Sequence, residues 1–168
     1  MTVLKHTNGN IGGVNPIQYI FKEDVQSFVI NPSTLAGTLT LKPGRSWNYL
    51  YGSPDSIEVA GKEELQASGM KYSYDIKMMV PKDRPDVEMI LMLLNYQHLI
   101  INVVDKNGVS RYYGTVDCPM RKISNLMKPA TVEGYHGWQV VFSGQFALPA
   151  AYQELAGLPN VIPAPDGS

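Results

Sequence analysis

The sequence has a single cysteine, no long apolar run and no excess of positive charge. Because Cys118 stands alone, no intramolecular disulfide can form, which favours a reducing compartment. The longest apolar stretch, Met89–Leu94, is far shorter than the ~20 residues of a membrane helix. Residues 1–6 lack the apolar core of a signal peptide. A formal net charge of −1 argues against a general phosphate-binding surface. We expect no membrane association and no specific nucleic-acid readout.

The remaining composition indicates a folded domain. The 168 residues are 44% hydrophobic and 17% charged, which is ordinary for a globular protein. A chain of ~150 residues buries roughly 68–70% of its unfolded surface, enough for a core without disulfides. We expect a flexible, Gly- and Asn-rich arm over residues 1–14, a β-rich globular domain over residues 15–152, and a Pro-rich tail over residues 153–168.

Apolar and polar residues alternate from Met70 to Val80, which is the pattern of a strand with one buried face. Tyr72, Tyr74 and Ile76 are expected to face the core. The stretch from Gly52 to Ser68 is interpreted as a solvated hairpin with Gly61-Lys62 at its tip. Further strands are expected at Ile17–Phe21, Val25–Ile30, Thr38–Leu41, His98–Val104, Val109–Thr115 and Trp138–Phe146.

One helix is predicted after the long strand. Residues 81–86 carry helix-start residues, with Pro85 in the first turn, and Val87–Leu94 is nearly all apolar. Such a helix must be covered on most sides, by the sheet or by another subunit. Residues 150–155 are expected to form a second, short helix. The fold class is mainly β (β-rich α+β): seven to nine strands in an antiparallel sandwich or barrel, one packed helix and extended terminal arms.

Residues that carry chemistry are scattered. His6, His98 and His136 lack the spacing of a metal site. Cys118 follows Asp117, which opposes formation of a thiolate, so we expect a small buried or half-buried residue at a strand end rather than a nucleophile. We therefore expect no catalytic residue, no cofactor and no metal, and a protein that is not an enzyme.

Other charged and glycine-rich groups have ordinary explanations. Residues 9–13 are rich in glycine but lack the Gly-Lys-Ser/Thr ending of a phosphate loop. A solvated surface explains the clustered carboxylates Asp55, Glu58, Glu63 and Glu64. The same explanation is preferred over a basic channel for Arg45, Arg111, Arg121 and Lys122.

Aromatic residues at turns and strand ends are the more informative group, because Tyr and Trp are enriched at interfaces. Together with apolar residues of the arm and the helix, they define a candidate interface. Its members are Ile11, Trp47, Tyr49, Tyr51, Met89, Met92, Tyr112 and Trp138.

Several features occur together: a Gly-rich arm, a long alternating strand leading into a Pro-bounded helix, the hairpin sequence Val103–Arg111, and a final strand running into Leu148–Ala150. With them, residues 14–152 resemble small virion proteins of tailed bacteriophages and prophages, of the tail-tube, tail-terminator and neck-adaptor group. The resemblance implies a non-enzymatic structural subunit of a phage tail or neck, which assembles into a homo-oligomeric ring by self-association and arm exchange. Neighbouring virion proteins would be its other partners. Its location would be the virion, and the host cytoplasm during assembly.

Two other classes stay open. One is a free-standing β-sandwich binding module that uses Trp47, Tyr49 and Tyr51 for a carbohydrate or protein ligand. The other is an enzyme whose site is too dispersed to see in the sequence.

Overall fold

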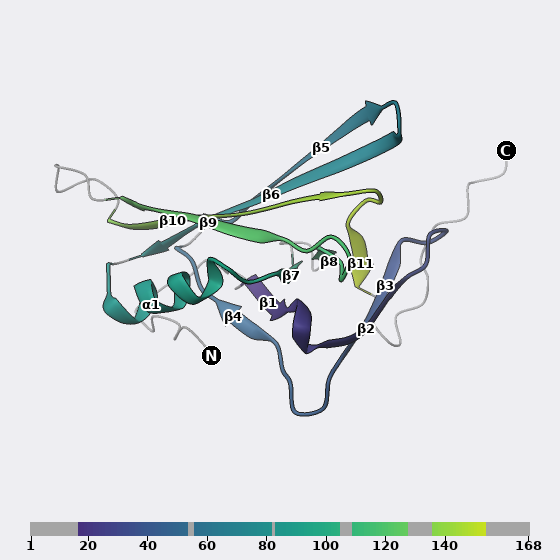
Figure 1. Ribbon diagram of the computed structural model, residues 1–168. Coiled ribbons are helices and arrows are strands. Elements are labelled where there is room, and N and C mark those ends of the chain that lie inside the picture. The colour runs from purple at the N-terminus through teal and green to yellow at the C-terminus, as the bar shows by residue number, and fades with distance from the viewer. Residues whose placement is uncertain (1–16, 54–55, 82, 105–108, 128–135, 154–168) are drawn as a thin grey trace, which may run out of the picture.

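The computed structural model describes residues 17–53, 56–81, 83–104, 109–127 and 136–153. Strands dominate this part of the chain, and one α-helix accompanies them (Figure 1). The elements are β1 (Ile17–Phe21), the 3-10 helix η1 (Lys22–Asp24), β2 (Val25–Ile30), β3 (Ala36–Leu41), β4 (Asn48–Leu50), β5 (Glu58–Gln66), β6 (Gly69–Pro81), α1 (Pro85–Leu94), β7 (Leu99–Val104), β8 (Ser110–Tyr113), β9 (Arg121–Met127), β10 (Gly137–Phe146) and β11 (Ala151–Gln153).

The strands form two sheets. The larger has seven strands in the order β2-β3-β11-β8-β7-β1-β4, with β11 and β3 parallel. The smaller has four strands in the order β5-β6-β10-β9, and all of its pairs are antiparallel. The fold is therefore mainly β with one helix, as the sequence predicts.

The core fills the space between the two sheets and α1. Ile76 and Met78 of β6 and Phe142 of β10 are fully buried in it. Strands of the larger sheet and the buried face of α1 complete this cluster. A smaller cluster on the other face of the larger sheet contains Ile20 and Ile100.

A pair of backbone hydrogen bonds joins the two sheets. The N–H of Leu99 in β7 donates to the carbonyl of Met120 at 3.0 Å, and the N–H of Met120 donates back at 2.8 Å. Met120 immediately precedes β9, so the start of this strand is fixed to the middle of the seven-stranded sheet. The segment that leads to Met120 begins at Gly114, whose φ of 97° favours glycine. A side chain would not fit there either, because an added Cβ would lie 2.9 Å from the carbonyl oxygen of Leu99.

Local patterns in the sequence predicted several elements well. The expected strands at residues 17–21 and 25–30 are confirmed as β1 and β2, and the alternating stretch is β6. Within β6, Ile76 is buried, while Tyr72 and Tyr74 are half-buried and pack against the core. The helix begins at Pro85, because its fixed φ suits the first turn and its missing N–H costs no hydrogen bond there.

Three expectations are wrong. Gly61 is not at a hairpin tip but inside β5, opposite Tyr74, whose ring would lie 2.9 Å from an added Cβ. The absent side chain makes room for this ring, and the turn falls at residues 67–68. Residues 151–153 form strand β11 rather than helix, because they complete the gap between β8 and β3. The described residues also contain eleven strands rather than seven to nine.

The expected arm, residues 1–14, lies outside the described residues. So do the expected hairpin turn at residues 105–108 and residues 154–168 of the expected tail.

Candidate functional site

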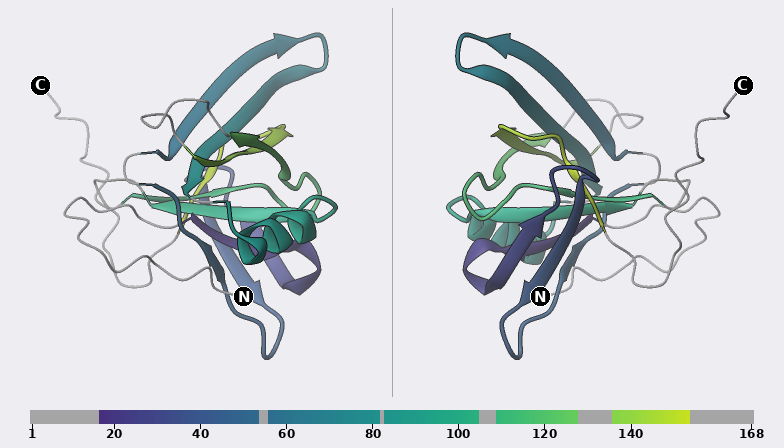
Figure 2. Two further views of the ribbon diagram at one scale, coloured as in Figure 1. Left: turned by 90° about the vertical axis from the view of Figure 1, so that its left-hand side faces the viewer. Right: turned by 90° about the vertical axis from the view of Figure 1, so that its right-hand side faces the viewer.

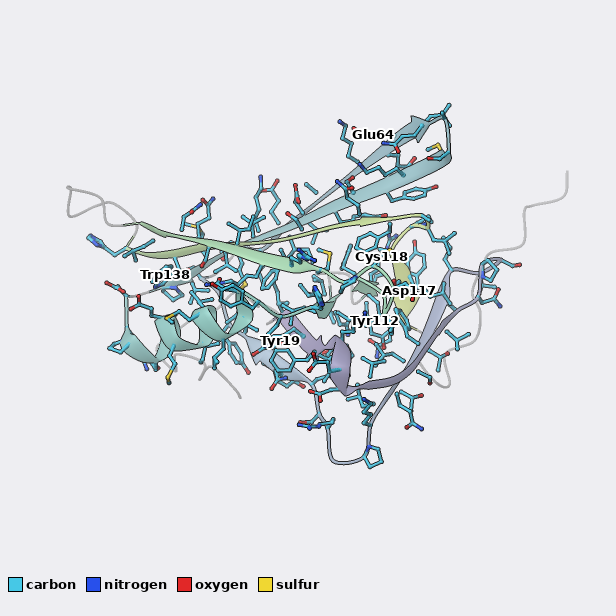
Figure 3. The ribbon with its side chains drawn as sticks, in the orientation of Figure 1. Tyr19, Glu64, Tyr112, Asp117, Cys118 and Trp138 are labelled. Atoms are coloured by element: carbon cyan, nitrogen blue, oxygen red, sulfur yellow. The ribbon has the colours of Figure 1, made fainter. Side chains whose placement is uncertain are left out.

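The candidate interface residues do not form one surface. Trp47 is half-buried, and its ring stacks on Tyr112 with centroids 6.0 Å apart. The Tyr112 ring, labelled in Figure 3, is buried rather than free for an interface. The Phe28 ring packs edge-on against it, with centroids 5.4 Å apart. Burial also raises the pKa of the Tyr112 hydroxyl by desolvation. Tyr49 and Tyr51 are half-buried.

The other candidate interface residues lie elsewhere. Trp138 is half-buried in β10, and its Nε1 is buried without an acceptor in the described part of the chain. Ile11 falls outside the described residues. Met89 and Met92 lie on α1 and are 53% and 62% exposed.

In the part of the chain that the structure describes, one face of helix α1 is buried and the other is exposed. Val87, Ile90, Leu91 and Leu94 are buried, whereas Met89, Met92 and Leu93 are exposed. The sequence predicted that most sides of this helix are covered. Within the described residues, only the face with the four buried residues is covered. Coverage of the other face by a second subunit stays a prediction.

The basic residues have individual roles. Arg45 forms an ion pair with Asp24 at 3.1 Å, and the guanidinium of Arg111 lies 4.2 Å from the centre of the Tyr152 ring. The prediction that Lys122 lies on a solvated surface is wrong, because this residue is only 4% exposed. Its Nζ donates to the carbonyl of Leu91 at 2.6 Å and to Oγ of Ser124 at 2.9 Å. Desolvation lowers the pKa of Lys122 to about 8.

No group of three or more His, Cys, Asp and Glu side chains able to hold a metal ion occurs among the described residues. The expected burial of Cys118 is wrong, because this residue is exposed. Its backbone N–H donates to Oγ1 of Thr115 at 3.0 Å. A partly buried polar cluster connects side chains of β1, β7, β8 and β11. Ser110 donates to Oδ1 of Asn102 at 2.6 Å, and Nδ2 of Asn102 donates to the side-chain oxygens of Gln18 and Gln153 at 3.1 Å.

Two strands of the smaller sheet have one open side. β5 pairs with β6 along its whole length, and β9 pairs with β10 along its whole length. Neither has a second partner strand among the residues that the structure describes. The N–H and C=O groups on the open side of such a strand are a template for pairing with another chain.

The β5–β6 hairpin extends beyond the rest of its sheet, as Figure 2 shows from two sides. β10 ends at Phe146, which is level with Tyr72, so the hairpin from Glu64 to Lys71 has only its own two strands. Near its tip Leu65 and Met70 lie opposite each other and are 81% and 42% exposed. Sequence reasoning missed this pair, because alternation in β6 assigns Met70 to a core-facing position.

An apolar pocket of about 340 Å³ opens near the end of β10. One wall is the segment Thr115–Cys118, and the labelled side chains of Asp117 and Cys118 lie near β11 in Figure 3. Its other walls carry mainly apolar side chains, among them Phe28, Ile30, Phe146, Leu148 and Pro149.

Comparisons with protein-family models, with curated proteins and with solved structures gave no match. Within the described residues, α1 and η1 are both too short to cross a lipid bilayer.

Proposed function

We propose that this chain is a non-enzymatic structural subunit that assembles head to tail with copies of itself into a ring. The observation that carries the proposal is the pair of open edges, β5 and β9, on one four-stranded sheet. The resemblance of the sequence to small virion proteins of tailed phages supplies the context: a phage tail or neck, with neighbouring virion proteins as further partners.

Strand directions support this mode of assembly. The four strands alternate in direction across the sheet, so β5 and β9 run in opposite directions. When one copy is related to the next by rotation about an axis roughly along the strands, β5 of one lies antiparallel to β9 of the other. The contact uses two different surfaces of the same chain. It therefore repeats, and it gives a ring if the rotation closes and a helical filament if it does not.

Exposed apolar side chains on the two edge strands are consistent with coverage by a neighbour. Val59 and Leu65 on β5 are 37% and 81% exposed, and Ile123 and Leu126 on β9 are 62% and 43% exposed. β5 also carries charged residues, with an ion pair between Lys62 and Glu64. Charges on an edge strand oppose indiscriminate pairing, so they favour a specific partner edge.

A free-standing binding module is less well supported. It would present Trp47, Tyr49 and Tyr51 to a ligand, but the three rings are half-buried. Trp47 also stacks on Tyr112, so one of its faces already has a partner within the chain.

The mass of the particles in solution and their appearance in negative stain test the proposal. Ile123→Lys on β9 should weaken assembly, because a lysine on an open edge is a common means of preventing pairing. Val29→Lys is the matched control: Val29 is 65% exposed and lies on β2, an edge of the other sheet. A wild-type protein that stays monomeric at high concentration, also with the other virion proteins present, would refute the proposal. Equal effects of the two lysines would refute the role of β9.

A further inference from the structure

Among the residues that the structure describes, nothing buries the Leu65–Met70 pair, which is 81% and 42% exposed. The two side chains lie on the face of the sheet that also carries Tyr74 and Ile76, because β5 and β6 keep one register along the hairpin. Ile76 is buried in the core, whereas Leu65 lies beyond the end of β10 and is 81% exposed. The ladder stays regular to Gln66 and Gly69, so the hairpin presents this apolar pair on a paired, two-stranded support.

The register of the sheet indicates where the tip of a neighbouring hairpin lies. This step rests on the proposed head-to-tail pairing. Within one sheet Arg121 of β9 is level with Ser143, Asp75 and, on β5, Ala60. If a neighbour continues the sheet at the same level, its Ala60 lies beside Arg121.

Leu65 of that neighbour then lies five residues further along β5 (65 − 60 = 5), or about 17 Å. β5 and β9 are antiparallel in this arrangement, so the displacement leads back along the chain that enters β9. That chain is the segment that follows Gly114, and its residues Thr115–Cys118 form one wall of the apolar pocket. The hairpin tip of one copy is therefore directed toward the side of the next copy on which the pocket lies.

The pocket is large enough for an apolar pair, and one of its walls lies on the side of the smaller sheet that carries Leu65 and Met70. An engineered cavity of roughly 150 Å³ accepts a benzene-sized group, so 340 Å³ is enough for two side chains of that size. Phe146, on the core-facing side of β10, contributes one wall. Leu65 and Met70 lie on the same side of the sheet.

We propose that the Leu65–Met70 pair at the tip of the β5–β6 hairpin docks in the pocket beside Cys118 of a second copy of this chain. The partner is thus the same protein, and the contact adds a side-chain anchor to the pairing of the two edges. Because the anchor and the pocket are different surfaces, every copy offers one of each.

The position of Cys118 allows a direct test, because the chain has no other cysteine. A chain with Leu65→Cys and Cys118→Ser is co-expressed with a size-tagged wild-type chain and oxidised. We expect disulfide-linked pairs of one chain of each kind, which can form only between positions 65 and 118. The control chain carries Tyr96→Cys and Cys118→Ser. Tyr96 is 92% exposed and follows α1, and this helix lies away from the β5–β6 hairpin in Figure 1. We expect no mixed pairs above background for this control.

The single variant Leu65→Cys, which keeps Cys118, shows whether the contact is between copies. We expect a ladder of covalent oligomers. A disulfide within one chain would overturn the proposal, because the hairpin would then reach its own pocket.

A second measurement uses no cysteine. Leu65→Asp should weaken self-association about tenfold or more, since it removes the burial of one large aliphatic side chain. Val29→Asp, at a site that is 65% exposed on β2, should leave it unchanged. Assembly of unchanged strength without mixed disulfides would overturn the docking and leave the ring proposal intact. A chain that never assembles would overturn both.

Discussion

Lys122 offers a prediction that can be worked out from its contacts. The carbonyl of Leu91 lies in the last turn of α1, where carbonyls lack intrahelical partners. The N–H of Asn95, which would bond Leu91 in a longer helix, donates to Met92 instead at 3.1 Å. The Lys122 ammonium supplies the missing donor, but at 4% exposure it also loses most of its hydration.

The loss of hydration makes the free energy of unfolding depend on pH. The pKa of Lys122 is about 8 in the folded chain and, without burial, has its ordinary value of 10.5. Between these values the unfolded chain binds a proton that the folded chain has released, so stability rises as the pH rises. From pH 7 to 9.5 the gain is about 2 kcal/mol. Burial raises the pKa of Tyr19 and Tyr112, which lowers stability above pH 10 and sets the upper end of this window.

Urea unfolding followed by tryptophan fluorescence at pH 7, 8 and 9.5 measures this gain. Lys122→Met keeps an unbranched chain but removes the titrating group, so its stability should lack the rise. Lys77→Met, at an exposed position of β6, serves as the control and should keep it. Groups that titrate in all three proteins cancel in the comparison. An equal rise in wild type and Lys122→Met would refute the reasoning.

Two further predictions concern the long strand and the termini. Tyr74→Asp should cost about 2–4 kcal/mol of stability, because it places a charge against the core and removes an acceptor of the Ala150 N–H. Ser73→Asp, on the other face, should change thermal unfolding little, and equal costs would contradict the register of β6. Deleting residues 1–13 and 156–168, whose composition predicts arms, should leave the melting transition nearly unchanged but weaken assembly. Intact assembly after truncation would contradict the arm hypothesis, and a lost transition would place these residues in the core.

Elements with a strong local signal were predictable from the sequence. The alternation of apolar and polar residues predicts β6 correctly, because a period of two places one set of side chains on the core side of a strand. The start of α1 is also predicted correctly, because Pro85 favours the first turn of a helix independently of the residues that pack against it. Both signals act within a few residues of the element that they define.

The errors concern contacts between distant residues. Gly61 looks like a turn residue locally, yet it is required by the ring of Tyr74 on the neighbouring strand. Residues 151–153 have no strand pattern of their own. They form a strand because they pair with β8 on one side and with β3 on the other. The exposed pair near the hairpin tip depends on where β10 ends, which no pattern in β5 or β6 records.

The hydrogen bonds between Leu99 and Met120 have a mechanical consequence. They tie the entry of β9 by its backbone to β7, which lies within the seven-stranded sheet. In the proposed ring a pull from a neighbour along β9 loads these two bonds in addition to the ladder with β10. The force then spreads through main-chain hydrogen bonds into the larger sheet and does not depend on side chains that can change rotamer. The larger sheet therefore shares the tension that neighbours in the proposed ring exert on β9.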